Sequence, residues 1–377
     1  MKIVSKKKIA FFSTTRAEFG LIQPLLSKIY LNKLFTSYFF VGGSHLVNDY
    51  GKTILEIKNK KIKINEIFNF YSDKKKDNKN LIDALAKETK QLNKIFQKFD
   101  FDTIIILGDR YELLPIVTCA ILYNKKIVHI GGGEKTLGII DEQVRNMVSK
   151  SAHLHFTSNK YFKKQLINMD ENYRSIFNVG SLSTENIKKI KRIDKKNLFQ
   201  KFKIDIKLPL ILMTYHSTTL EFNVSVKEQI NNIFKALEQF NFSVIITGPN
   251  IEKNSDIIKN IKIKNTRKNK NYQYFDSLGF DNYHQLMKYS NFVIGNSSSG
   301  IIETPYYKIP TVNVGIRQKK RLRHISIIDC NYQQIEIVKS IKKASSENFK
   351  KKISNMKYLF GNGNSSEKII KVLEKYI

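Results

Sequence analysis

Tryptophan is absent from this sequence of 377 residues, and cysteine occurs only twice. Cys119 and Cys330 stand alone, which excludes a disulfide framework and a cysteine-rich metal site. The sequence has no apolar run of the ~18–20 residues that cross a bilayer, and residues 1–20 lack the apolar centre and cleavage site of a signal peptide. We therefore expect a cytoplasmic protein with no membrane partner.

Acidic residues are few beside basic ones: 33 aspartates and glutamates face 65 lysines and arginines, and the formal net charge is +32. A basic surface attracts nucleic acids without regard to their sequence. However, the lysines are spread over the whole chain, with no nucleic-acid-binding motif and no basic stripe interleaved with aromatic residues. We interpret the charge as a compositional bias and predict no nucleic-acid partner.

Arginine is the rarer of the two long cations, with only nine in the chain. Its planar guanidinium binds phosphate or carboxylate through two parallel hydrogen bonds, which lysine cannot form. Six of the nine stand inside the polar motifs described below, which favours those motifs as anion sites. These six are Arg16, Arg110, Arg145, Arg317, Arg321 and Arg323.

The first half of the chain alternates short apolar runs with helical patterns. Strands are predicted at residues 8–13, 34–41, 103–107, 126–130, 153–157 and 176–180, helices at 17–30 and 81–99, and a loop at 58–80. Arg16, His45 and the pair Asp109–Arg110 follow three of these strands, where parallel sheets bind ligands. We take Arg16, His45 and Arg110 as candidate substrate-binding residues. His45 fits a surface-loop histidine equally well, and the pair fits a salt-bridged turn.

The second half repeats the pattern after residues 192–207, a charged segment without apolar periodicity. Strands are predicted at 210–214, 243–247 and 310–314, and helices at 281–289 and 366–376. His216 and Asn250 follow the first two strands, and Arg317 lies in a basic loop after the third that could screen a pyrophosphate. His216 is a candidate acid, base or phosphate donor, or else a hydrogen-bonded turn histidine.

The stretch from Phe292 to Glu303 predicts a strand, a tight polar turn and the start of a helix. Unpaired N–H groups at a helix start favour anions, and the hydroxyls of Ser297 and Ser298 add donors there. Glu303, one turn further on, is placed to accept hydrogen bonds from the paired hydroxyls of a sugar. Phosphate and sugar together indicate a nucleotide, although a serine at a helix start often only caps the helix.

A glycine-rich segment, residues 131–145, follows the strand at 126–130 and carries Glu134 and Asp141. Consecutive glycines let the backbone approach a ligand closely. With Asp109 from the neighbouring strand end, Glu134 and Asp141 are expected to converge on one crevice. Carboxylates paired in a cleft supply a general base and a general acid near neutral pH.

The fold predicted from this pattern is α/β, with two Rossmann-like domains facing each other across a cleft. We expect an N-terminal domain at residues 1–192, carrying the carboxylates Asp109, Glu134 and Asp141, and a nucleotide-binding C-terminal domain at 208–360. A terminal helix within residues 361–377 is expected to pack back on the first domain. Neither a metal nor a nicotinamide site is predicted, because the sequence has no ligand cluster and no G-x-G-x-x-G after its first strand.

Seven motifs, with His216 before the fifth, occur in a fixed order: TRAEFG, GGSHL, GDRYE, HIGGGEKTLGIID, GPN, GNSSSGIIE and GIRQKKRLR. In this order they resemble the hydrolysing UDP-N-acetylglucosamine 2-epimerases of bacterial sialic-acid synthesis, over nearly the whole chain. The resemblance implies a glycosyltransferase-B-like fold, a UDP-sugar substrate and no external cofactor. We also expect a homo-oligomer, either a dimer or a tetramer.

The resemblance also assigns roles on the nucleotide side of the site. Ser297 and Ser298 would hold the phosphates, and Glu303 the ribose. The nucleotide or its diphosphate would further contact Arg16, Asn250 and Arg317. His216 would lie beside the diphosphate.

On the sugar side, the resemblance places Asp109, Glu134 and Asp141. In the reaction of the family, a base removes the proton at carbon 2 while UDP leaves carbon 1, which gives a glycal. Water then adds, carbon 2 is protonated on its opposite face, and free N-acetylmannosamine is released. A carboxylate base and cationic stabilisation of the departing diphosphate suit this elimination.

The chain departs from its relatives at two places. Gly131 stands where many of them have Glu or His, and Asn146 replaces a histidine often found after the arginine of the motif. The acid or base role would then fall to Glu134 or Asp141, or the pocket would suit another sugar. UDP-N,N'-diacetylbacillosamine, the precursor of legionaminic acid, and a GDP-sugar are alternative substrates. A glycosyltransferase of the same fold and a binding protein without catalysis are the alternative functions.

Overall fold

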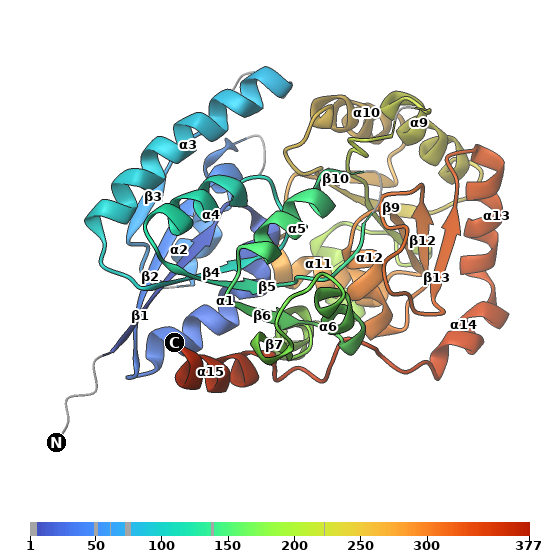
Figure 1. Cartoon of the computed structure of the whole chain (residues 1–377). Helices are drawn as coiled ribbons and strands as arrows, with labels where there is room; N and C mark the ends of the chain where they lie inside the picture. Colours follow the sequence, from blue (N-terminus) through green and yellow to red (C-terminus); the bar gives the residue numbers. More distant parts are fainter. Residues whose placement is uncertain (1–5, 49–51, 61, 72–76, 137–138, 222) are drawn as a thin grey trace.

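Two parallel β-sheets, one in each half of the chain, form the centre of the protein (Figure 1). They are seen in a computed structural model that describes residues 6–48, 52–60, 62–71, 77–136, 139–221 and 223–377. In Figure 1 the half with blue and green strands and the half with yellow and orange strands lie side by side. Over those described ranges, no helix is both long and apolar enough to cross a membrane.

The first sheet has seven strands in the order β3-β2-β1-β4-β5-β6-β7, and all neighbours run parallel. Its strands are β1 (Lys7–Ser13), β2 (Phe35–Gly42), β3 (Glu66–Phe68), β4 (Thr103–Leu107), β5 (Lys126–Ile130), β6 (Leu154–Thr157) and β7 (Ile176–Asn178). Successive side chains of β1 enter the apolar cores on opposite faces: Phe11 packs in the cluster that includes Leu25, and Phe12 in the cluster that includes Phe96.

In the described residues these strands are connected by the α-helices α1 (Arg16–Leu31), α2 (Ile54–Asn59), α3 (Asn78–Lys98), α4 (Leu113–Leu122), α5 (Asp141–Lys150) and α6 (Lys160–Ile167), and α7 (Leu182–Lys189) follows the last strand. The start of α1 is fixed by a capping box. The Thr15 hydroxyl accepts a hydrogen bond from the backbone N–H of Glu18, and the Glu18 carboxylate accepts one from the N–H of Thr15. This cap determines where the side chain of Arg16 leaves the backbone.

The second sheet has six strands in the order β10-β9-β8-β11-β12-β13, again all parallel. Its strands are β8 (Leu210–Thr214), β9 (Ser243–Thr247), β10 (Tyr272–Phe275), β11 (Phe292–Gly295), β12 (Thr311–Val314) and β13 (Ile327–Cys330). The helices of this half are α8 (Lys195–Lys201), α9 (Val226–Leu237), α10 (Ser255–Lys268), α11 (Gly279–Tyr289), α12 (Ser299–Ile302), α13 (Gln334–Ser345) and α14 (Glu347–Ser354), and α15 (Ser365–Tyr376) follows.

The two sheets share one topology, which confirms the predicted α/β class with two Rossmann-like halves. In each sheet the chain starts in the middle and moves to one edge, then returns to the middle and moves to the other. The strand order therefore reverses between β1 and β4, and again between β8 and β11. Open α/β sheets bind ligands at the carboxyl ends of such strand pairs, so two binding crevices are expected, one from each half.

The chain passes between the halves twice. The first passage follows α7, and the second leads into α15, whose Ile369 and Leu373 join the apolar core beside the first sheet. Figure 1 shows α15 below α1. The second passage contacts the first half at a pair of glycines: a Cβ added to Gly361 would lie 2.9 Å from the Cα of Gly180, which precedes α7. This contact therefore requires residues without side chains.

Two predicted irregular segments contain regular structure. The predicted loop at 58–80 includes β3, a short strand that pairs with β2 at the sheet edge, although residues 61 and 72–76 lie outside the described residues. The charged segment at 192–207 includes α8, where Leu198 and Phe199 are buried in a core of the second half. Each element has too few apolar residues to show a period.

Candidate active site

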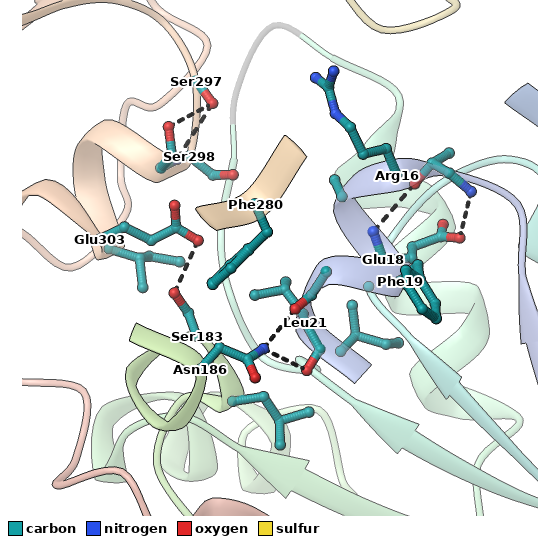
Figure 2. A pocket seen from close by; sticks show the side chains of 18 of the residues that line it. Arg16, Glu18, Phe19, Leu21, Ser183, Asn186, Phe280, Ser297, Ser298 and Glu303 are labelled. Atoms are coloured by element: carbon teal, nitrogen blue, oxygen red, sulfur yellow. Dashed lines mark hydrogen bonds between the residues drawn. The ribbon is translucent and has the colours of Figure 1, made fainter. Parts of the chain in front are cut away.

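A cavity of about 780 Å³ lies between the two sheets. The candidate site residues that line it are Arg16, Asp109, Arg110, Glu134, Asp141, His216, Asn250, Ser297, Ser298, Glu303 and Arg317. Figure 2 shows one part of this cavity, where Arg16 lies on the opposite side from Ser297 and Ser298. The strand ends of both halves thus supply one common site.

His45 does not line the cavity, so the prediction of a ligand contact is wrong for this residue. Its side chain is fully buried, with Nε2 2.9 Å from the Ser13 hydroxyl and Nδ1 2.7 Å from the Thr53 hydroxyl. Burial, with the charge of Arg16 nearby, lowers the pKa of His45 to about 3. The neutral ring joins the turn after β2 to the end of β1.

Asp109 follows β4 and is held by two arginines. Arg145 of α5 donates a hydrogen bond to Oδ2, and Nη2 of Arg321, from the second half, lies 3.7 Å from the same oxygen. Burial alone would raise the pKa of Asp109, but Arg145 and Arg321 outweigh it and hold the pKa below its ordinary value. Asp109 is therefore a carboxylate at neutral pH.

Asp141 is the first residue of α5, and its environment shifts its pKa in the direction opposite to that of Asp109. Its closest cation, Nη2 of Arg317, lies 3.8 Å from Oδ2. Burial, and next the negative charge of Asp109, raise the pKa of Asp141 to about 7, although Arg110 and Arg317 oppose the shift. The cavity thus holds one ionised carboxylate and one that exchanges its proton near neutral pH.

Glu134 completes the predicted carboxylate cluster. Its Oε2 accepts an ion-pair contact of 2.9 Å from Nη1 of Arg321, and its Oε1 accepts a 3.4 Å hydrogen bond from the Ser158 hydroxyl. Arg321 belongs to the basic loop that the sequence suggested as a pyrophosphate screen. Its guanidinium instead contacts Glu134 and Asp109 of the other half, across the cavity.

Arg110 lines the cavity, but most of its donors are already in use. It donates to Glu252 at 2.8 Å, to the carbonyl of Ile251 at 2.8 Å and to Glu112 at 3.2 Å. Glu252 also pairs with Nη2 of Arg317 at 3.3 Å. Arg110 therefore joins the two halves beside the site. It has few free N–H groups left for the substrate contact that the sequence predicts.

His216, which follows β8, offers a neutral N–H group to the cavity. Burial, with the charge of Arg317 adding to it, lowers the pKa of His216 well below its ordinary value. The backbone N–H of Asn250 donates to Nδ1 at 3.0 Å, so the ring carries its proton on Nε2. The side chain of Asn296 accepts from the N–H of His216 and donates to its carbonyl, at 2.8 and 2.9 Å. His216 is a fixed neutral donor and not a cation.

The serine turn after β11, residues 296–298, leads into the predicted start of a helix, but this helix is very short. α12 has only four residues and continues as a 3₁₀ turn over Thr304–Tyr307. A helix this short has a small dipole, so anion binding here depends on individual donors. Ser297 and Ser298 line the cavity, and the Ser297 hydroxyl accepts from the backbone N–H of Ser299 at 3.3 Å.

Glu303 is held by residues of both halves. The hydroxyl of Ser183, in α7, donates to Oε1 at 2.9 Å, as Figure 2 shows, and Nε2 of His284 lies 3.4 Å from Oε2. Burial raises the pKa of Glu303 to about 7, and the Ser183 hydrogen bond opposes this. The carboxylate therefore faces the cavity in a fixed orientation.

Arg16 lies at the beginning of α1 on the opposite wall. Its Nη1 donates to the carbonyl of Asp276 at 2.9 Å, which is a further contact between the halves. Ser183 and His284 were missed by sequence reasoning because no motif surrounds them, and Glu252 because it lies just beyond the GPN motif. Arg321 was recognised only as part of a basic loop, and its rarity as an arginine was the one available signal.

Among the described residues, no three His, Cys, Asp or Glu side chains are grouped so as to hold a metal ion. The side chains that line the cavity supply carboxylates, guanidinium groups, hydroxyls and a neutral imidazole. Carboxylates of the first half face hydrogen-bond donors of the second half. Such a division suits a ligand with an anionic part and a sugar part.

Comparison with known proteins shows the family to which the chain belongs. The family model described as UDP-N-acetylglucosamine 2-epimerase matches residues 28–374. The GDP/UDP-N,N'-diacetylbacillosamine 2-epimerase (hydrolyzing) of Campylobacter jejuni is 36% identical over 352 residues, which cover 92% of this chain and 90% of that protein. Polysialic acid biosynthesis protein P7 of Escherichia coli is 31% identical over 373 residues, 98% of this chain and 94% of that protein.

A solved structure shares the fold. The UDP-GlcNAc 2-epimerase of Neisseria meningitidis, solved with UDP-GlcNAc bound, matches with a TM-score of 0.79 and 18% identity, covering 98% of this chain and 100% of that chain. The match of the family model and the two relatives confirm the resemblance predicted from the motifs. The chain belongs to the UDP-N-acetylglucosamine 2-epimerase family of enzymes.

Proposed function

We propose that this enzyme is a hydrolysing 2-epimerase that converts UDP-N-acetylglucosamine into N-acetylmannosamine and UDP. The observation that carries the proposal is the shared cavity, in which Asp109, Glu134 and Asp141 of the first half face the donors of the second half. A nucleotide sugar has its sugar and diphosphate adjacent, so one molecule spans both sets of groups. The proposed pathway is the synthesis of sialic-acid-type sugars.

The nucleotide is proposed to bind the second half. Glu303 accepts hydrogen bonds from the ribose hydroxyls, while Ser297 and Ser298 donate to the phosphates. Arg16 and Arg317 neutralise the diphosphate from opposite sides. Two neutral groups, the side chain of Asn250 and Nε2 of His216, complete the donors.

The reaction begins with proton abstraction. The ionised Asp109 takes the proton from carbon 2, the C–H electrons form the double bond between carbons 1 and 2, and the bond from carbon 1 to oxygen breaks. The electron pair departs on UDP, whose charge Arg317 and the N–H of His216 stabilise. The product of this step is a glycal.

Hydration of the glycal completes the reaction. Asp141 exchanges its proton near neutral pH, so it suits the acid that protonates carbon 2 on the opposite face. Water adds its oxygen to carbon 1 and gives up a proton, with Glu134 as the nearest further carboxylate. The result is the free manno-configured sugar, and no external cofactor takes part.

UDP-N,N'-diacetylbacillosamine is the second candidate substrate, with its GDP counterpart. The relative from Campylobacter jejuni is named for this sugar. In addition, Gly108 and Gly131 leave the floor of the cavity open: a Cβ at Gly108 would meet nothing within 4 Å, and one at Gly131 only Gly108 at 3.8 Å. A sugar with a second acetamido group would find room there.

Two further features are part of the proposal. We place the enzyme in the cytoplasm, where its free thiols Cys119 and Cys330 would stay reduced. We also expect a homo-oligomer, a dimer or a tetramer, because α4 exposes Ile121 and Leu122 at its end.

A proton NMR time course in deuterated water tests the proposed function. Each nucleotide sugar is supplied alone, without an acceptor. Release of UDP with a free manno-configured sugar that carries deuterium at carbon 2 is the expected result, and the faster substrate identifies the sugar. If neither substrate is consumed until an acceptor is added, the enzyme is a glycosyltransferase; if both bind and neither reacts with any acceptor, it is a binding protein.

A further inference from the structure

A buried histidine that does not line the cavity is hydrogen-bonded to the peptide that precedes Asp109. His129 lies on β5 with its side chain fully buried. Its Nε2 is 2.8 Å from the carbonyl oxygen of Gly108, the residue directly before Asp109, and its Nδ1 is 3.1 Å from the hydroxyl of Ser149. These two contacts form a chain of hydrogen bonds from α5 through β5 to the end of β4.

The direction of this chain follows from its last member. A carbonyl oxygen can only accept, so Nε2 of His129 must carry the proton and donate it to Gly108. The neutral ring then has an unprotonated Nδ1, which accepts from the Ser149 hydroxyl. Burial lowers the pKa of His129 to about 4, which keeps the ring in this neutral form at neutral pH. Both ring nitrogens of His129, the Ser149 hydroxyl and the Gly108 carbonyl therefore each have a defined hydrogen-bond partner.

Helix α5 supports Asp109 in two ways, through Arg145 and through Ser149. Asp141, Arg145 and Ser149 are spaced four residues apart in α5, and residues at this spacing share one face of a helix. Arg145 holds the carboxylate of Asp109, whereas Ser149 acts through His129 on the preceding carbonyl. The N–H of Gly108 is also bound, since it donates to the carbonyl of Ile130 at 2.9 Å.

The glycine-rich motif makes room for the chain of hydrogen bonds. A Cβ added to Gly132 would lie 3.0 Å from the Ser149 hydroxyl oxygen and 3.2 Å from Nδ1 of His129. Both distances are tighter than ordinary contacts, so a side chain at this position would push the two partners apart. A glycine at position 132 therefore leaves the space that the hydrogen bond between His129 and Ser149 requires.

We propose that His129 and Ser149 are positioning residues, which hold the Gly108–Asp109 peptide so that the Asp109 carboxylate meets the reacting carbon. The inference rests on the proposed function, in which Asp109 is the base. A displacement of about 1 Å in a catalytic group costs up to ~100-fold in rate, so a loosened peptide would lower kcat. Substrate binding depends on other residues, so KM would change little.

The test compares His129→Leu, which removes both hydrogen bonds, with His129→Gln, whose amide N–H can still reach Gly108. His155→Leu is the matched control, because His155 is equally buried and lies opposite His129 in the register of β5 and β6, without a contact to Gly108. Steady-state kinetics, UDP affinity and melting temperature are measured for all three, and Ser149→Ala provides a milder change in case His129→Leu does not fold.

His129→Leu is expected to lower kcat roughly 10- to 100-fold, with KM and UDP affinity within about threefold, and Ser149→Ala to lower kcat less. His129→Gln is expected to recover most of the lost rate, and His155→Leu to keep the wild-type kcat whatever its melting temperature. Equal kcat losses in His129→Leu and His155→Leu, or no recovery in His129→Gln, would overturn the proposal.

Failure of the proposed function is recognised separately, because the wild-type enzyme would then release no UDP from any nucleotide sugar. Crystal structures of the wild type and of His129→Leu decide the positioning in that case. A shifted Gly108–Asp109 peptide in the variant supports the inference. An unchanged Asp109 carboxylate, still on Arg145, refutes it.

Discussion

Asp109 and Asp141 face the same cavity, yet the protein moves their pKa values in opposite directions. The pKa of Asp109 lies below its ordinary value because the charges of Arg145 and Arg321 outweigh the effect of burial. The pKa of Asp141 is raised to about 7 because burial and the charge of Asp109 outweigh the charges of Arg110 and Arg317. Two carboxyl groups whose pKa values differ in this manner can act as base and acid at the same pH, which the proposed reaction requires.

Asp109→Asn tests the assignment of the base. The amide keeps the shape of the side chain but cannot take a proton, so turnover is expected to fall at least ~100-fold. UDP affinity, measured by calorimetry, should stay within a few-fold, because the proposed nucleotide contacts lie elsewhere. Unchanged turnover would remove Asp109 from the chemistry.

Asp141→Asn should stabilise the protein at alkaline pH. The folded-state pKa of about 7 lies above the ordinary value of 3.8, so ionisation of Asp141 disfavours the folded state as pH rises from about 4 to 7. An asparagine avoids this penalty, and the gain in unfolding free energy should be roughly 2–4 kcal/mol at pH 8.5. Thermal denaturation at pH 8.5 and pH 4.5 checks the sign: the gain should shrink at the lower pH, and a destabilised variant at pH 8.5 would contradict it.

Glu303→Gln and Ser298→Ala should each weaken nucleotide binding, and only the first should change its pH dependence. Glu303 has a pKa of about 7, so its carboxylate becomes protonated and loses acceptor capacity as pH falls through that value. Binding of UDP-N-acetylglucosamine is measured between pH 8 and pH 6 in an Asp109→Asn background, where the substrate survives. We expect affinity to fall with pH and the slope to decrease in Glu303→Gln. Native affinity in both variants would show that the serine turn is not the nucleotide site.

Arg321→Gln distinguishes two roles of the basic loop. Its guanidinium contacts Glu134 and Asp109, so the variant should lower kcat roughly tenfold and leave UDP affinity nearly unchanged. The matched control is Arg323→Gln in the same loop, because Arg323 pairs with Asp329, away from the carboxylates. A large loss of UDP affinity in Arg321→Gln would return the loop to its predicted function as a pyrophosphate screen.

Most of the fold followed from apolar runs that end in polar motifs. The strands predicted at 103–107, 126–130, 210–214 and 243–247 coincide with β4, β5, β8 and β9. These are interior strands, and burial on both faces makes them continuous apolar segments with clear ends. β3 and β10 were missed because edge strands are short and keep polar side chains.

The candidate site was predictable to the extent that strand ends determine it. Asp109, His216 and Ser297 each follow a recognisable strand, and the structure brings them to one cavity. His45 also follows a strand, but its partner Thr53 lies in a segment without a motif, so its burial could not be inferred. Ser183 reaches Glu303 only because the two halves face each other, which is a property of tertiary packing and not of any local pattern.

The contact between Gly180 and Gly361 attaches the end of the second passage to the first half. Because no side chain separates the two backbones, this attachment is close, and α15 continues from it into the apolar core beside the first sheet. That core is therefore built from both ends of the chain. Its packing is completed only after the whole second half has been synthesised, because Ile369 and Leu373 come last in the sequence.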